Sequence, residues 1–194
     1  MKGDKQPSRV RLGAFDPAIG FDREAGAFKF GSWYLVKTLF FLTPLPFPSF
    51  LKASLLRLFG AKVGPGLVIK PRVNIHFPWK LSIGKDVWIG EEANILNFER
   101  IQIGSNVCVS QRAFLCGGNH DYTDPAMPYR NGPIALHDGC WVGASCFVGP
   151  GVTIGQDSVI AAASVVTRNV EPGGIFKGDP LIFIKKRWQY RDAY

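Results

Sequence analysis

An aliphatic residue returns at every sixth position through most of this chain, starting at Val63. In the second half the period is unbroken, and the residues in phase are Leu136, Val142, Val148, Ile154, Ile160 and Val166. A second small or apolar residue follows four places after each aliphatic residue, at Cys140, Cys146, Val152, Ser158 and Ser164. This spacing fits neither the 3.6-residue period of an α-helix nor the strict alternation of a hairpin strand. It predicts a parallel β-helix, in which each hexad supplies one short strand and one corner.

The first half carries the same repeat with two interruptions. Val63, Ile69 and Ile75 are in phase, and the phase then slips by two before Ile83 and again before Ile103. Three hexads make one coil, so we expect about six coils within residues 61–172. Glycine follows the aliphatic residue at Gly143, Gly149 and Gly155, where corners need a residue that tolerates unusual φ and ψ.

The N-terminal 60 residues contain no hexads and read as an apolar, helical segment. Ser49 is placed to begin a helix that ends near Gly60, and this helix can cap the open end of the β-helix. The alternative is an interfacial membrane anchor built from Trp33, Phe40, Phe41, Phe47 and Phe50 with the cations Lys37, Lys52 and Arg57. Residues 173–194 read as a basic C-terminal tail.

Composition limits the partners and the location. The 194-residue chain has a net charge of +8, which favours an anionic partner. Its basic residues lack the aromatic or glycine pattern of nucleic-acid modules, so we expect no nucleic acid, and a phosphate-rich cofactor or an anionic membrane surface remains. The start of the chain does not resemble a secretory signal and no stretch could span a bilayer, so we expect a cytoplasmic protein. The four cysteines include no C-x-x-C pair and read as core residues.

The repeat breaks between Leu115 and Leu136, where 21 positions separate two in-phase residues. The intervening segment is rich in glycine and proline and contains His120, one of three histidines in the chain. Such a segment must leave the stack as a loop, over about residues 116–135, and loops on rigid scaffolds commonly carry functional groups. We therefore expect His120 to be functional.

These features together resemble the hexapeptide-repeat O-acetyltransferases. The motifs that carry the resemblance are Gly117–Tyr122, Cys140–Gly143, Pro150–Gly155 and Ala161–Arg168, and the chain is most similar to the colanic-acid-type polysaccharide acetyltransferases, relatives of the galactoside and maltose enzymes. The resemblance implies a left-handed β-helix that forms a homotrimer, with acetyl-CoA bound between neighbouring subunits and no metal. It also implies an acetyl-CoA-dependent O-acetyltransferase that acts on a sugar hydroxyl in cell-surface polysaccharide biosynthesis.

The resemblance assigns roles to individual residues. His120 matches the catalytic histidine, which takes the proton of a sugar hydroxyl in a direct transfer without an acyl-enzyme. The residues that match the cofactor channel are Trp141, Ala144, Ala162, Thr167 and Arg168. The usual cation of the C-terminal Gly-x-Pro motif is absent at Ile182, and Lys185 with Lys186 and Arg187 can serve the CoA phosphates instead.

The acceptor site departs from the family pattern. The asparagine and aspartate that galactoside-type members place upstream of the histidine have no match here, and Asn94 and Asn97 lie nearby on a phase slip. The other candidates for the sugar or oligosaccharide acceptor, soluble or lipid-linked, are Asn119, Asp121 and Tyr122 in the loop. The alternatives are a xenobiotic or serine acetyltransferase, a zinc enzyme like the γ-type carbonic anhydrases, and a non-catalytic binding protein. His120 and His137 are too far apart in sequence for the zinc site.

Overall fold

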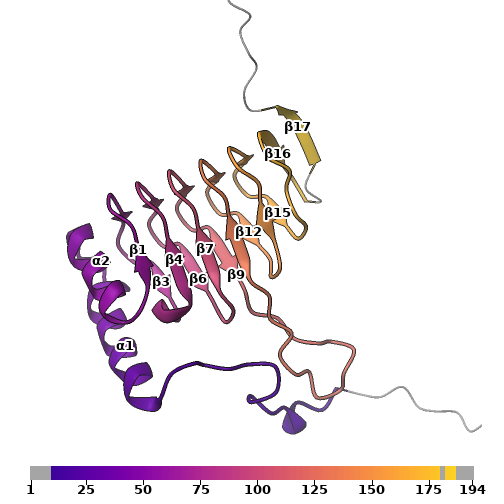
Figure 1. Ribbon diagram of the computed structural model, residues 1–194. Helices are drawn as coiled ribbons and strands as arrows, with labels where there is room; N and C mark the ends of the chain where they lie inside the picture. The colour runs from indigo at the N-terminus through magenta and orange to yellow at the C-terminus, as the bar shows by residue number, and fades with distance from the viewer. Residues whose placement is uncertain (1–9, 180–181, 187–194) are drawn as a thin grey trace, which may run out of the picture.

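The computed structural model describes residues 10–179 and 182–186, and it shows short parallel strands stacked as the three sides of a prism (Figure 1). Side A consists of β1 (Lys62–Val63), β4 (Leu81–Ile83), β7 (Ile101–Ile103), β10 (Ile134–Leu136) and β13 (Thr153–Ile154). Side B consists of β2 (Val68–Ile69), β5 (Trp88–Ile89), β8 (Cys108–Val109), β11 (Trp141–Val142), β14 (Val159–Ile160), β16 (Gly174–Lys177) and the antiparallel β17 (Ile182–Lys186). Side C consists of β3 (Asn74–Ile75), β6 (Asn94–Leu96), β9 (Phe114–Cys116), β12 (Phe147–Val148) and β15 (Val165–Val166). The expected left-handed parallel β-helix of about six coils is confirmed.

The interior follows the hexad pattern. In-phase residues such as Ile75, Leu115 and Ile160 have no exposed surface, and the partners four places later, such as Val73 and Ala113, are equally buried. Cys140 and Cys146 are buried core thiols, and none of the four cysteines is in a disulfide. The repeat predicts that the β-helix ends at residue 172. In the structure it continues beyond that residue, because β16 pairs in parallel with β14.

The glycines that follow the aliphatic residues have a different role from the one expected. The left-handed residue of each corner stands just before the inward partner, as at Arg112, Ser145 and Asp157, whereas Gly143 and Gly155 have no positive φ. A Cβ on Gly143 would lie 2.6 Å from the carbonyl oxygen of Ile160 and 2.7 Å from the amide nitrogen of Ala162. Gly143 and Gly155 are therefore needed because adjacent coils approach each other closely at these positions.

Gly143→Ala should lower the free energy of unfolding by about 1–3 kcal/mol, since backbone atoms of Ile160, Ala161 and Ala162 would have to move. Gly149→Ala is the matched control, because its Cβ would meet nothing closer than 3.4 Å and its φ is not positive. Urea denaturation of the two variants measures the difference. Equal stability of the two would contradict the close-approach explanation.

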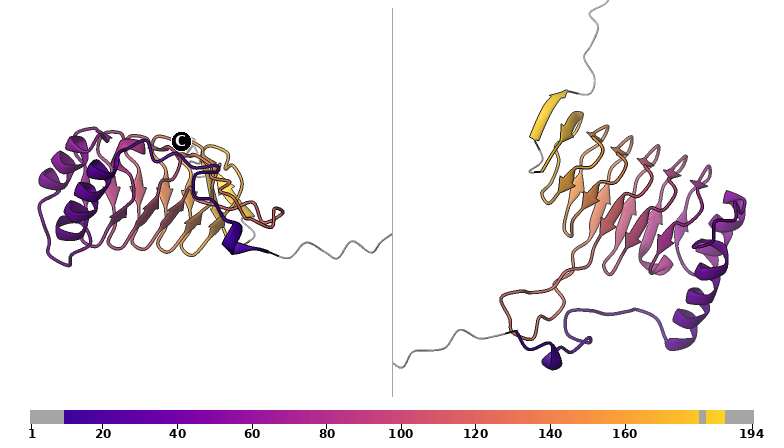
Figure 2. Two further views of the ribbon diagram at one scale, coloured as in Figure 1. Left: turned by 90° about the horizontal axis from the view of Figure 1, so that it is seen from below. Right: turned by 180° about the vertical axis from the view of Figure 1, so that it is seen from behind.

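Two helices cap the first coil. α1 (Ala27–Phe40) and α2 (Ser49–Leu58) lie side by side across the end of the prism, as both views of Figure 2 show. The Trp33 indole donates to the carbonyl of Ile75 (3.1 Å), and Lys52 Nζ donates to the carbonyl of Lys70 (2.9 Å). The Ser49 hydroxyl accepts from the amide of Ile69 (3.1 Å). These bonds satisfy backbone groups at the open edge, as the capping role requires.

Most residues that suggested a membrane anchor belong to this cap. Trp33 and Phe41 are buried, and Lys37 and Lys52 are buried with them. The half-buried rings of Phe40 and Phe47 contact each other at a tilt, with 5.0 Å between centroids. Trp33, Phe41, Lys37 and Lys52 are therefore part of the cap and are not available to lipid, because their side chains face the first coil. Phe50 and Arg57 remain exposed.

The interruptions of the repeat all lie on one edge of the prism, between sides C and A. The connecting segments there are 76–80, 97–100 and 117–133, and 78–80 form the 3-10 turn η2 (Pro78–Lys80). On the other two edges, every turn between β1 and β15 has four residues. We call these edges CA, AB and BC after the sides that they join. Edge CA is thus the part of the scaffold that departs from a plain repeat.

Candidate functional site

The loop of residues 117–133 projects from edge CA between β9 and β10 (Figure 1). Its two arms pair with each other, since the amide of Arg130 donates to Asn119 (2.8 Å) and that of Gly132 to Gly117 (3.0 Å). His120 and Tyr129 form an antiparallel bridge at its centre. The expected extruded loop is therefore an ordered hairpin-like structure that holds His120 in a fixed place.

His120 is held by one hydrogen bond and two aromatic contacts. Its Nδ1 lies 2.7 Å from the carbonyl oxygen of Met127. A carbonyl can only accept, so Nδ1 carries the proton and Nε2 is left with a free lone pair. The imidazole stacks on Tyr129 (4.8 Å between centroids) and meets the edge of Phe15 (5.5 Å). The ring is therefore oriented with an unprotonated nitrogen, as a general base requires.

An N-terminal arm, residues 10–22, lies against the loop. It contains the 3-10 turn η1 (Leu12–Ala14). The amide of Arg11 donates to Pro125 (2.7 Å), and the amide of Tyr129 donates to Ile19 (3.2 Å). Phe21 packs against Tyr129 and Phe98. This arm was not expected from the sequence, and the only signal for it is the pair of aromatic residues Phe15 and Phe21 in a stretch without hexads.

Asn97 is a structural residue of edge CA and not a group for the acceptor. It is completely buried, its Oδ1 accepts from the amide of Phe77 (2.9 Å), and its Nδ2 donates to the carbonyl of Phe77 (2.5 Å). Both ends of the amide are therefore used to join two coils. Asn94 is half-buried on side C, where its Oδ1 accepts from Asn74 Nδ2 (3.3 Å).

The loop candidates differ in how much of their polar surface is already used. Asn119 is exposed, and its Oδ1 accepts from the amide of His120 (2.8 Å). Asp121 accepts from the hydroxyl and the amide of Thr123 (2.6 and 2.9 Å), and these bonds lower the pKa of its carboxyl. Tyr122 is 78% exposed and projects from the loop. Asn119 and Asp121 thus shape the loop around His120, and Tyr122 is open to a ligand.

The cofactor candidates divide between two edges. Trp141 lies half-exposed on side B, and its indole donates to the Ser110 hydroxyl (2.9 Å). Ala144 and Ala162 follow on edge BC, where the amide of Ala163 donates to the carbonyl of Ala144 (2.8 Å). Thr167 and Arg168 are exposed on edge CA, beyond the loop. The Lys185 side chain, like Arg187, lies outside the described residues, and nothing is assigned to Lys186.

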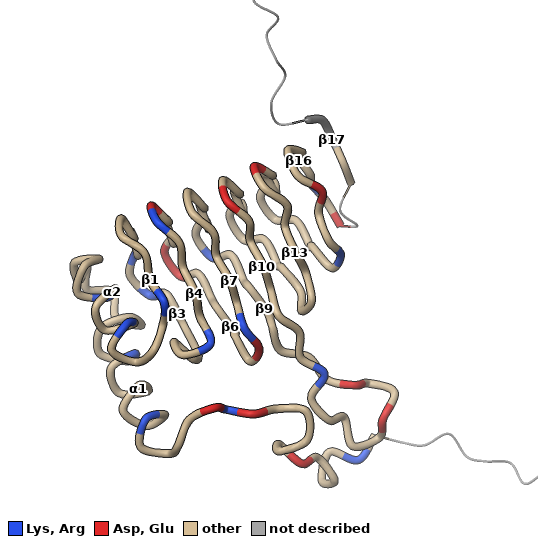
Figure 3. The backbone as a smooth tube through the Cα atoms, in the orientation of Figure 1, with Lys and Arg blue, Asp and Glu red and all other residues tan. Residues whose placement is uncertain are grey.

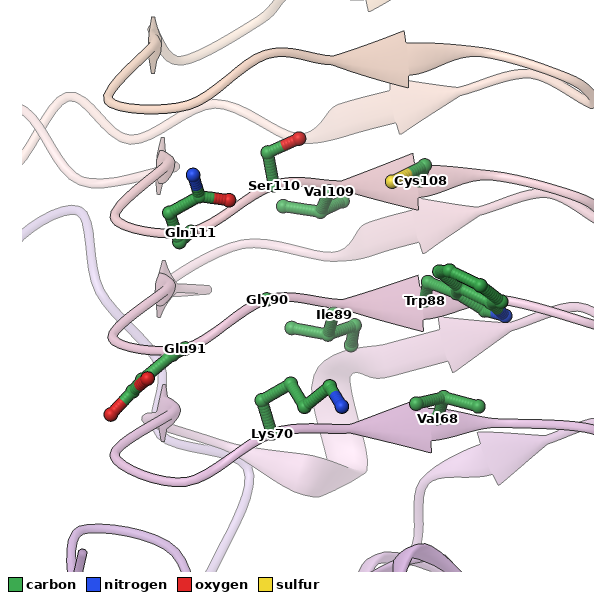
Figure 4. Close-up of a pocket in the computed structure, with 10 residues that line it drawn as sticks. All are labelled: Val68, Lys70, Trp88, Ile89, Gly90, Glu91, Cys108, Val109, Ser110 and Gln111. Carbon is green, nitrogen blue, oxygen red and sulfur yellow. The ribbon is translucent and has the colours of Figure 1, made fainter.

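A groove of about 430 Å³ lies on side B beside Trp88 (Figure 4). Val68, Trp88 and Cys108 form its apolar floor, and Ser110, Gln111 and Glu91 supply polar groups at edge BC. Trp88 is 62% exposed, and the ladder pairs it with Cys108, which pairs in turn with Trp141. Trp88 was not expected as a site residue, although its position in the repeat is equivalent to that of Trp141.

The site residues of a single chain do not converge. His120 and its loop lie at edge CA, whereas Trp141, Ala144 and Ala162 lie at side B and edge BC. Side C, one whole face of the prism, separates the two groups. Among the described residues, no cluster of three or more His, Cys, Asp or Glu side chains could hold a metal ion.

Comparison with known proteins identifies the family. The family model "Bacterial transferase hexapeptide (six repeats)" matches residues 134–168. The chain is 37% identical to the colanic acid biosynthesis acetyltransferase WcaF of Escherichia coli (strain K12) over 177 residues, which cover 91% of this chain and 96% of that protein.

Two solved structures share the fold. A hexapeptide-repeat acetyltransferase of Vibrio cholerae in complex with acetyl-CoA superposes with a TM-score of 0.73, at 23% identity over 83% of this chain and 86% of that one. A galactoside acetyltransferase in complex with coenzyme A superposes with a TM-score of 0.75, at 23% identity over 86% of this chain and 84% of that one. The resemblance expected from the motifs is confirmed, and the chain belongs to the family of hexapeptide-repeat acetyltransferases.

Proposed function

We propose that this acetyltransferase transfers the acetyl group of acetyl-CoA to a sugar hydroxyl, with His120 as the general base. The observation that carries the proposal is the bond from Nδ1 to Met127, because it leaves Nε2 free to accept a proton. Nε2 would take the hydroxyl proton as the sugar oxygen attacks the thioester carbonyl. Collapse of the tetrahedral intermediate would then break the C–S bond, and the imidazolium would return the proton to the CoA sulfur.

Direct transfer is supported by the state of the nearest thiol. Cys116, just before the loop, is buried, and its Sγ donates to the carbonyl of Gly118 (3.3 Å). Burial raises the pKa of this thiol, so the thiolate that an acyl-enzyme would need is disfavoured. A covalent intermediate on Cys116 therefore has no support.

The acceptor proposal rests on the groove beside Trp88. An exposed indole offers a flat face for a sugar ring, and Ser110, Gln111 and Glu91 offer hydrogen bonds to hydroxyl groups. The relative from Escherichia coli is named for colanic acid biosynthesis, which favours a polysaccharide precursor over serine or a xenobiotic. We place the reaction in the cytoplasm, where acetyl-CoA is available, and acceptor screening separates these substrate classes.

We further propose a homotrimer in which each site is shared between two chains. The outward side chains of side B are apolar, at Val68, Trp88, Cys108, Trp141, Val159 and Ile175, whereas those of side A are mostly polar, at Lys62, Ser82, Gln102, Ala135 and Thr153. Side B is therefore the face that would contact another copy, and the groove beside Trp88 would then lie at the boundary between the two chains. The neighbour's His120 loop would then meet Trp141, Ala144 and Ala162 across a cleft that holds acetyl-CoA.

Mixed trimers test the shared site. His120→Ala removes the base, and Ala162→Arg blocks the cofactor edge at an exposed position. Each homotrimer should be inactive. In random co-assembly of equal amounts, a site needs a chain with His120 beside a chain with Ala162, and each is present at about one half of the positions. About one quarter of the wild-type sites should therefore be restored. Separately purified variants combined without exchange of subunits are the control. An active monomer in sedimentation, or co-assembled trimers without activity, would contradict the shared site.

A further inference from the structure

A second apolar surface lies on the outside of the two N-terminal helices. Its residues, which we call the cap face, are Phe28, Leu35, Leu39, Leu42, Leu45, Phe50 and Leu58. The side chains of Phe28, Phe50 and Leu58 are 89%, 75% and 77% exposed, so the packing of the two helices does not cover them. The seven residues come from α1, the following connection and α2, and these two helices lie at the end of the prism (Figure 1).

No charged side chain lies among the exposed residues of α1, and the exposed polar residues of α2 are Ser54 and Arg57. The basic residues of α1 are turned away from the cap face, since Lys29 Nζ lies over the Trp79 ring (4.7 Å) and Lys37 is buried. The exposed positions of α1 are occupied by uncharged residues, which are Ala27, Phe28, Gly31, Tyr34, Leu35, Thr38 and Leu39. A group of large exposed apolar residues on neighbouring helices indicates an interaction site, whereas single exposed apolar residues do not.

The charge around the cap face has one sign. Residues 25–85 contain nine basic residues and no acidic residue, and the rest of the chain has 14 basic and 15 acidic residues. The net positive charge of the protein therefore comes from the cap and the first two coils, and Figure 3 shows Lys and Arg but no Asp or Glu on α1, α2 and β1. Acidic residues border this range at both ends. Glu24 precedes α1 and is paired with Lys80 and Arg100, and Asp86 follows Lys85.

Several of these cations are exposed and unneutralised. Lys62, Lys70 and Lys85 are exposed on the first two coils. The Arg57 guanidinium donates to the carbonyls of Val63 (3.0 Å) and Gly64 (3.1 Å), which fix its position beside the cap without cancelling its charge. Arg72 is the exception, because it pairs with Glu92 (3.1 Å).

We infer that the cap face docks on the surface of a membrane that contains anionic phospholipids. The apolar side chains would enter the interface between headgroups and acyl chains, and the surrounding cations would meet lipid phosphates. No helix among the described residues is long and apolar enough to cross a membrane, so the contact is peripheral. A second copy of the chain is disfavoured as the occupant, because it would bring together two ends that each carry a net positive charge.

Co-sedimentation of the full-length protein with sucrose-loaded vesicles tests this inference. The wild type should bind vesicles of phosphatidylglycerol and phosphatidylcholine, and bind phosphatidylcholine vesicles more weakly. Leu35→Asp/Leu39→Asp should weaken binding by at least about ten-fold, because two charged side chains replace two that would enter the interface. Ile182→Asp is the control for a new charge at an exposed apolar residue, since Ile182 is 52% exposed at the opposite end of the prism. It should change binding by less than about two-fold.

A second pair of variants tests the charge. Lys62→Glu/Lys70→Glu should weaken binding to anionic vesicles at low salt, and Lys177→Glu, an exposed position far from the cap, should not. Circular dichroism and thermal unfolding establish that each variant is folded. Failure of the wild type to bind anionic vesicles, or equal binding by Leu35→Asp/Leu39→Asp, would overturn the inference. If the wild type does not bind vesicles and Leu35→Asp/Leu39→Asp has a lower oligomeric mass than the wild type, the cap face would instead be assigned to a second copy of the chain. Acetyl transfer to a soluble sugar is a separate readout, so the docking inference and the proposed function can fail independently.

Discussion

His120→Ala should lower kcat by about 10²- to 10⁴-fold, the loss typical for removal of a general base. Nε2 is the nitrogen that the Met127 contact leaves unprotonated, and Cys116, the nearest thiol, is disfavoured as a substitute nucleophile. The variant should still fold and bind CoA, since His120 lies on a loop outside the core. Steady-state kinetics with isothermal titration of CoA separates the two effects.

His137→Ala is the matched control for this result. His137 is exposed on edge AB, away from the loop, and its loss should leave kcat almost unchanged. Transfer by His120→Ala at the wild-type rate would refute the general-base role. A similar loss in both variants would point to a nonspecific effect on folding.

The second large effect concerns His76, which should make the fold sensitive to mild acid. Burial and the nearby charge of Lys37 lower the pKa of His76 from 6.5 to about 4. Its Nδ1 is buried without a hydrogen-bond partner, and its ring meets Phe77 and Phe98. Between pH 6.5 and 4, the unfolded chain therefore binds a proton that the folded protein does not, so stability falls as the pH falls.

The expected loss from this residue is about 2 kcal/mol between pH 7 and 5, approaching about 3 kcal/mol near pH 4. His76→Phe keeps an aromatic ring and removes the titration, so the pH dependence of its unfolding free energy should be smaller by that amount. Urea denaturation of wild type, His76→Phe and His137→Ala at pH 7 and 5 measures this. Parallel curves for the wild type and His76→Phe would show that His76 is not buried in its neutral form.

The fold could be predicted from the sequence because the six-residue period is specific to a β-helix. Each in-phase aliphatic residue occupies an inward position of a strand, so the spacing gives the strands, the corners and the number of coils without knowledge of distant contacts. The extruded loop could also be predicted, because glycine and proline cannot continue a coil and 21 positions cannot be filled with whole hexads.

The errors concern residues whose role depends on a distant partner. Trp33, Phe41, Lys37 and Lys52 look like an anchor in the sequence, but they face the first coil. Asn97 looks available for a sugar, but its amide joins two coils. The local sequence does not indicate which face of a helix another element covers. The contact between Phe15 and His120 joins residues that are more than a hundred positions apart in the chain. Such assignments require the tertiary structure.

The contact between the N-terminal arm and the loop limits how acceptor specificity could be exchanged between relatives. The strand ladders do not pass through edge CA, so an inserted segment of a different length there would leave the register of the coils unchanged. Residues 117–133 nevertheless share hydrogen bonds and aromatic packing with residues 10–22. A graft of the loop alone would leave Phe15 and Phe21 against a foreign surface. The two segments therefore form one transplantable unit, although almost a hundred residues separate them in the chain.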